Sequence, residues 1–169
     1  MKKVIMMIAL LAIPFAMQAQ SKFHDVEANE AKGAVKSITV TVMGMSRTIN
    51  FSEEGKMLPS ADLSDPVYDA DGYIQSAKIT IQGQSTQIKY IWENGRLKGQ
   101  SMQMMGQEVV TTHNYDANGV VTSETMNMGG NKIDVPYSDI KFDEQGNWIS
   151  RKSSAMGQEM VSTRTIVYY

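Results

Sequence analysis

Glycine recurs along this chain at a fixed interval, and this interval constrains the fold more than any other feature of the sequence. Five pairs of glycines stand 11 residues apart, and each pair encloses a segment of apolar and small residues. The pairs are Gly33–Gly44, Gly72–Gly83, Gly95–Gly106, Gly119–Gly130 and Gly146–Gly157. A repeated interval of this kind indicates that one supersecondary unit is built several times over.

The five enclosed segments align without gaps, and their columns fit a β-strand. The residue at the second position is always apolar: Val35, Ile74, Leu97, Val121 and Trp148. The residue at the fourth position is always small: Ser37, Ser76, Gly99, Ser123 and Ser150. The seventh and ninth positions are mostly apolar and share a face, because side chains alternate along a strand. The second position has the opposite parity. Either both faces are partly covered, or a β-bulge beside the small residue resets the parity, and we favour the bulge.

After each segment the chain returns with the same period of two, as at 88–92 and 133–137, where β-branched and aromatic residues occupy every second position. In four of the five units one turn has an acidic residue followed three positions later by glycine, and Glu93-Asn94-Gly95 is a tighter version; both are hairpin chemistry. We therefore predict an all-β fold over residues 30–169, an antiparallel up-and-down meander of about ten strands built from β-hairpin repeats. A sheet of this size should be curled or barrel-like, because a flat one would leave its apolar face in water.

The first residues have the pattern of a secretory signal peptide. Lys2 and Lys3 precede a run of 14 mostly apolar residues, and small and polar residues follow at 18–21. We assign residues 1–19 to the signal peptide and 20–29 to a linker or short helix. The sequence has no cysteine, which excludes disulfides and a lipid-modified cysteine. The expected location is therefore periplasmic or extracellular, as a soluble protein that is neither a lipoprotein nor an integral membrane protein.

Three segments carry a family resemblance. Tyr-Asp-Ala-Asp-Gly from Tyr68, Tyr-Asp-Ala-Asn-Gly from Tyr115 and Phe-Asp-Glu-Gln-Gly-Asn-Trp from Phe142 resemble the YD repeats of RHS-type secreted proteins. The segment from Ile91 to Leu97 is also similar to MORN-type hairpin repeats. Large RHS proteins wrap such strands into a shell around a toxin, but this chain has about five units and no cargo domain. The resemblance therefore implies a small secreted β-hairpin repeat protein and gives no activity.

Methionine is unusually frequent near the second turn of the units, and ten of the fourteen methionines follow residue 19. The candidate binding residues among them are Met102, Met104, Met126 and Met128. Three interpretations remain open: ordinary packing by flexible thioethers, an adaptable apolar surface for a lipid, peptide or protein, and a Cu(I) site that His113 could join. Trp92 is a further candidate, because an exposed aromatic ring can stack on a glycan.

The sequence shows no constellation of catalytic residues. His113 occupies an alternating position that other units fill with aromatic residues, which favours a semi-buried strand residue over a catalyst. The acidic pairs at 69–71 and 116–118 lack the five ligand positions and distal glutamate of an EF-hand, and turn formation already explains them. We therefore predict no catalytic residue, no metal site and no cofactor, and we do not expect an enzyme.

The net charge of −2 and the scattered basic residues argue against nucleic acid as a partner. The function predicted is that of a secreted, non-catalytic β-repeat protein, a binding or structural module for an unknown protein, lipid or glycan. The alternative is a periplasmic carrier that holds an apolar ligand inside the curled sheet. A Cu(I)-binding protein and a hydrolase are further, weaker alternatives.

Overall fold

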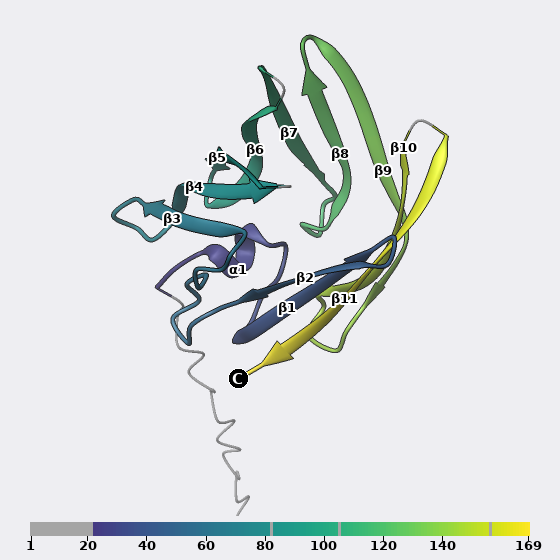
Figure 1. The fold of residues 1–169 in the computed structure, drawn as a ribbon. Coiled ribbons are helices and arrows are strands. Elements are labelled where there is room, and N and C mark those ends of the chain that lie inside the picture. Colours follow the sequence, from purple (N-terminus) through teal and green to yellow (C-terminus); the bar gives the residue numbers. More distant parts are fainter. Residues whose placement is uncertain (1–21, 82, 105, 156) are drawn as a thin grey trace, which may run out of the picture.

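The computed structural model describes residues 22–81, 83–104, 106–155 and 157–169. In these ranges the chain forms one short helix and one curled antiparallel sheet (Figure 1). The elements in chain order are α1 (Asp25–Ala28), β1 (Val35–Val42), β2 (Met45–Asn50), β3 (Leu63–Tyr68), β4 (Ile74–Ile81), β5 (Gln84–Glu93), β6 (Arg96–Met104), β7 (Gln107–Tyr115), β8 (Val121–Met128), β9 (Asn131–Phe142), β10 (Trp148–Ala155) and β11 (Gln158–Tyr168). The predicted all-β meander is confirmed, with 11 strands rather than about ten. The stretch 20–29, predicted as a linker or short helix, contains α1, and the predicted signal peptide at 1–19 lies outside the described residues.

The strand order shows where the curled sheet is open. The sheet runs β2-β1-β11-β10-β9-β8-β7-β6-β5-β4-β3, so strand β1 pairs with the last strand of the chain. This is the pairing that closes an up-and-down sheet into a ring. Within the described residues, the gap in the ring lies between β2 and β3, which are the two edges of the sheet. The segment between them, which contains Pro59, matches the place where the repeat is interrupted in the sequence.

Strand β9 joins the two halves of the sheet. Its first half pairs with β8 as far as Pro136, and its second half pairs with β10 from Tyr137 to Phe142. The proline therefore stands where the strand changes neighbours, and this is consistent with the bend or bulge that proline predicts inside a strand. Figure 1 shows β3 to β8 on one side of this long strand and β10, β11, β1 and β2 on the other, with α1 in the space they enclose.

The predicted bulge is confirmed in all five units. In each unit the register shifts between the second and fourth positions, so that two residue steps on one strand face a single step on the other. Each second residue faces an aromatic residue: Val35 faces Tyr168, Ile74 faces Tyr68, Leu97 faces Trp92, Val121 faces Tyr115 and Trp148 faces Phe142. The bulge turns the second residue inward together with the seventh and ninth. This end of the curled sheet is therefore lined by buried apolar residues.

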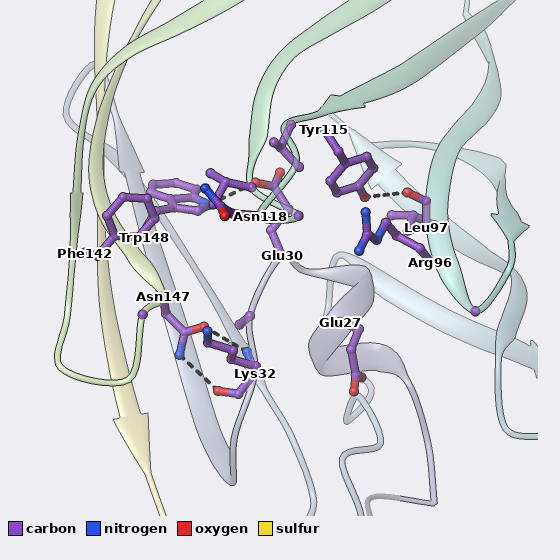
Figure 2. Close-up of a pocket in the computed structure, with 16 residues that line it drawn as sticks. Glu27, Glu30, Lys32, Arg96, Leu97, Tyr115, Asn118, Phe142, Asn147 and Trp148 are labelled. Carbon is purple, nitrogen blue, oxygen red and sulfur yellow. Dashed lines mark hydrogen bonds between the residues drawn. The ribbon is translucent and has the colours of Figure 1, made fainter.

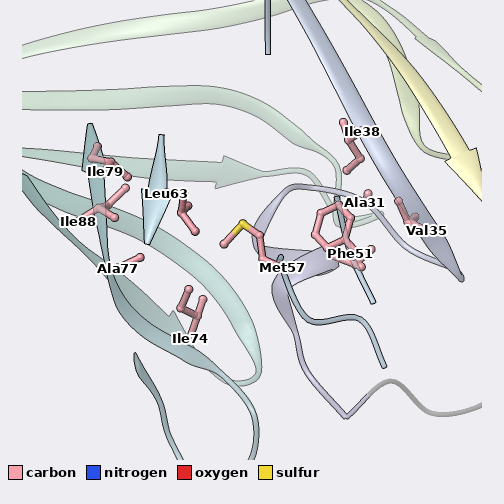
Figure 3. Close-up of a cluster of buried hydrophobic side chains, with 11 residues drawn as sticks. Ala31, Val35, Ile38, Phe51, Met57, Leu63, Ile74, Ala77, Ile79 and Ile88 are labelled. Atoms are coloured by element: carbon pink, nitrogen blue, oxygen red, sulfur yellow. The ribbon is translucent and has the colours of Figure 1, made fainter. Parts of the chain in front are cut away.

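The hydrophobic core lies between the two edges of the sheet and holds them together across the gap. Ile38 of β1 belongs to the same cluster as Ile79 and Ile88 of β4 and β5, and Phe51 and Met57 from the interrupted unit pack between them (Figure 3). Val26 of α1 is also buried in this cluster. The helix and the loop after β2 thus supply the packing that a β2–β3 pairing would otherwise provide. Their side chains cover only part of the concave face of the sheet.

Candidate functional site

The concave face of the sheet encloses a cavity of about 440 Å³. Cross-strand register places lining residues on one face, since Met102 of β6 stands opposite Ile88 of β5. On the other half of the sheet, Val40 of β1 stands opposite Arg47. The aliphatic and methionine side chains of the lining are those of Ala28, Ile38, Val40, Val42, Ile49, Met57, Leu63, Ile79, Ile88 and Met102. A cavity of this size is within the range of small-molecule sites.

The floor of the cavity is charged, and Glu30 is at its centre. This residue follows α1 with a φ of 53°, a conformation that non-glycine residues rarely adopt. Its carboxylate accepts hydrogen bonds from Arg151 Nη1 at 2.6 Å and from Trp148 Nε1 at 2.9 Å. Arg164 donates to the backbone oxygens of Asn29 and Glu30, at 2.6 and 3.2 Å. Two arginines of β10 and β11 therefore hold the segment that carries Glu30 in place.

The two arginines also stack on aromatic rings. The guanidinium carbon of Arg151 lies 3.6 Å from the ring centroid of Tyr137 and 4.0 Å from that of Trp148, and Arg164 lies 4.2 Å from Trp148. Burial lowers the pKa of Arg164 to about 10, and the neighbouring charge of Arg151 contributes in the same direction, while Glu30 opposes it. Among the described residues, Nε of both arginines is buried without a hydrogen-bond partner. Each guanidinium group thus keeps one buried donor that no described acceptor meets.

A histidine–glutamate pair borders this floor. His113 of β7 and Glu124 of β8 are cross-strand neighbours, and Nε2 of the histidine lies 3.6 Å from Oε1 of the glutamate. The histidine is only 4% exposed. Its Nδ1 lies 3.4 Å from the hydroxyl of Tyr115, which donates to the backbone oxygen of Leu97 at 2.5 Å. Burial raises the pKa of Tyr115 to about 12, so this hydroxyl keeps its proton at neutral pH.

A second, smaller hollow of about 250 Å³ lies at the bulged end of the sheet (Figure 2). Glu30 and Trp148 line both this hollow and the larger cavity, and so they separate the two. Asn147 stabilises one wall, because its side chain donates to the backbone oxygen of Lys32 at 3.0 Å and accepts from the backbone nitrogen at 2.9 Å. Arg96 packs on Tyr115 in the opposite wall, at 4.9 Å from the ring centroid.

The predicted binding residues do not all lie at the cavity. Met102 and His113 line it. Met126 faces Thr111 and Ile133 and is half-buried on the same concave face, whereas Met104 and Met128 at the rim are 42% and 41% exposed. These positions suit an apolar entrance, while the Cu(I) site stays a hypothesis.

Trp92, the remaining predicted site residue, lies in the wall near α1. Its Nε1 donates to the backbone oxygen of Ile74 at 2.7 Å, and its ring packs edge-on against Tyr73 at 4.9 Å. The indole is partly buried against the hydrophobic core, and this contact satisfies its only donor. The geometry is that of a packing residue, and a role for Trp92 in glycan binding stays a prediction.

The sequence patterns described above did not predict the charged floor of the cavity, although the aligned segments contain a signal for it. The fifth position of each unit has the inward parity of the seventh and ninth. Its residues are Ile38, Ala77, Gln100, Glu124 and Arg151. The column is apolar in the first two units and polar in the last three, so the inward face changes character along the chain. Polar residues at a position expected to be buried indicate a functional site.

Comparison with known proteins assigns no function to the site. No family model matches the chain, and no curated protein matches it. Among solved structures, the chain is matched to a porin-like protein from Bacteroides vulgatus, with 12% sequence identity, a TM-score of 0.46 and coverage of 80% of this chain and 98% of that one. The resemblance to YD and MORN repeats stays a prediction, because none of these comparisons bears on it. Among the described residues, no helix is long and apolar enough to cross a membrane.

Proposed function

We propose that this chain is an exported, non-catalytic binding protein that holds an amphiphilic small molecule inside its curled sheet. The observation that carries the proposal is the cavity on the concave face, whose wall is apolar and whose floor is charged. The carrier interpretation of the sequence requires such a space, since a concave face filled by side chains would leave no room for a ligand.

The apolar wall supports an apolar tail as the larger part of the ligand. The half-buried side chains of Met102, Val40 and Val42 remain available on this wall. Methionine adapts its shape to different apolar groups, which suits a binding surface that must accommodate flexible chains. The outer face of the sheet differs, because pairs of hydroxyl side chains such as Thr39 with Thr48 and Thr80 with Ser85 hydrogen-bond there.

The charge of the lining supports an anionic head group. Arg47, Arg151 and Arg164 line the cavity, against the carboxylates of Glu30 and Glu124. Arg47 is exposed on the edge strand β2 and stands opposite Val40. It is the arginine best placed to meet a ligand that enters from the open side, since the other two hold the segment around Glu30.

Binding of a fluorescent fatty-acid analogue to the purified chain tests this proposal. We expect saturable binding, and we expect Met102→Gln to weaken it about tenfold, because burial of a methionine side chain is worth about 1.5–3 kcal/mol. The matched control is Val161→Gln, since Val161 is 52% exposed on the outer face of β11. Absence of binding, or equal weakening by both substitutions, would contradict the proposal. Mass spectrometry of protein from its native host should show a co-purified amphiphile.

A further inference from the structure

We propose that Glu30, His113 and Glu124 form a binding site for a divalent transition-metal ion at the floor of the cavity. The three residues come from the segment after α1, from β7 and from β8, and each offers a ligand atom within 4.8 Å of the others. All three line the cavity, so an ion can reach them from solvent. The site does not depend on the proposed amphiphile.

The neighbours of His113 favour one of the two tautomers of its ring. The hydroxyl of Tyr115 has a single proton, and its 2.5 Å contact with the oxygen of Leu97 uses it. Towards His113 this hydroxyl can therefore only accept, and its 3.4 Å contact with Nδ1 suits the tautomer in which Nδ1 carries the proton. In the neutral ring Nε2 then carries a lone pair, and this lone pair faces the carboxylate of Glu124 at 3.6 Å.

In that tautomer Nε2 of His113 and the carboxylate of Glu124 both turn lone pairs to the same space, where a metal ion can lie between them. Bonds of about 2.1 Å from zinc to nitrogen and oxygen, at tetrahedral angles, place the ligand atoms about 3.4 Å apart. The 3.6 Å between His113 and Glu124 is close to this spacing. The ligand atom of Glu30 lies at most 4.8 Å from the other two, so it needs to move inward by about 1.4 Å at most.

Each of the three side chains also has the supporting contact that metal ligands usually have. Tyr115 orients His113, and Tyr137 lies beside Glu124. Oε2 of Glu30 accepts hydrogen bonds from Trp148 Nε1 and Arg151 Nη1. Among the described residues, Oε1 accepts only a longer hydrogen bond, of 3.3 Å, from Arg151 Nη2. That oxygen retains room for an ion, because a carboxylate has about four lone-pair positions. One imidazole and two carboxylates suit Zn²⁺ and its neighbours in the first transition row.

Calorimetric titration of the chelator-treated chain with Zn²⁺ at neutral pH tests the site. We expect one ion per chain, and at least tenfold weaker binding in Glu124→Gln and in His113→Gln. The matched control is His24→Gln: His24 lies beside Glu27 at 3.8 Å, outside the cluster, and its substitution should leave the affinity unchanged. Absence of stoichiometric binding, or binding that survives His113→Gln, overturns the proposal.

Thermal unfolding of Glu124→Gln without metal provides a second measurement that does not depend on tight binding. The glutamine amide can donate to the lone pair of Nε2, so we expect the melting temperature of the metal-free chain to rise while zinc binding is lost. If a proton on His113 satisfies the pair instead, the same substitution breaks an ion pair and the melting temperature falls. Nitrogen NMR of His113 should show a zinc-dependent shift of Nε2, and a doubly protonated ring that zinc leaves unchanged would refute the metal site.

Discussion

Asp25 shows at the scale of a single residue how the helix is attached to the sheet. Its carboxylate is fully buried, and Oδ2 accepts from the backbone nitrogen of Met57 and from the hydroxyl of Tyr68, both at 2.6 Å. The other oxygen, Oδ1, has no hydrogen-bond partner among the described residues. Burial raises the pKa of this carboxyl above its ordinary value of 3.8, and the two hydrogen bonds, Lys56 and His24 offset only part of that rise.

The substitution Asp25→Asn should remove a pH dependence of stability. Because the pKa is higher in the folded chain than in the unfolded chain, the fold favours the protonated carboxyl. The free energy of unfolding should therefore decrease as the pH rises from 3.8 to the raised pKa. The asparagine side chain keeps an acceptor for Met57 and Tyr68 and carries no charge. Denaturant titrations across this pH window should show the decrease in the native chain and not in the variant, and an equal decrease in both would exclude Asp25 as its source.

At the scale of the element, the bulged hairpin unit explains both the small fourth residue and the inward second residue. The fourth position is glycine only in the third unit, where it lies against β7. A Cβ atom added to Gly99 would lie 2.1 Å from the backbone oxygen of Thr111. The corresponding Ser150 of the last unit already has a Cβ atom, so the close approach is particular to β6 and β7.

Gly99→Ala should therefore separate β6 from β7 and lower the free energy of unfolding by about 1–3 kcal/mol, the usual cost of overpacking. Ser150→Ala is the matched control and should change the free energy by well under 1 kcal/mol, because no backbone must move. Chemical denaturation of both variants measures the difference. Equal effects of the two substitutions would show that the backbone contact at Gly99 has no such cost.

At the scale of the whole molecule, the segment from α1 to Ala31 connects the two halves of the sheet. Val26 and Ala31 are buried in the core cluster, while Glu30 is paired with Arg151 and the backbone around it with Arg164. The partners of Glu30 lie far along the chain, 121 residues away in the case of Arg151. This segment therefore fills the space that the missing β2–β3 pairing leaves.

A chain that starts at residue 32 should lose this connection, compared with one that starts at residue 20. The two arginines would then be buried without their carboxylate and carbonyl partners, and such unpaired charges cost about 3–5 kcal/mol. We expect the shorter chain to unfold at a markedly lower temperature and to bind the dye ANS, which reports exposed apolar surface. Identical melting temperatures for the two chains would mean that the sheet does not need the segment.

The sequence by itself determined the repeated local structure. Glycines at the turns, small residues at the fourth position and apolar residues of fixed parity specify hairpins and bulges, because these depend on backbone conformation within a few residues. The tertiary structure decided which units meet. The β1–β11 pairing, the gap between β2 and β3 and the convergence of Glu30 with His113, Glu124 and Arg151 depend on how the sheet curves. Contacts between residues so far apart in the chain leave no local pattern, so only the folded sheet brings the charged floor of the cavity together.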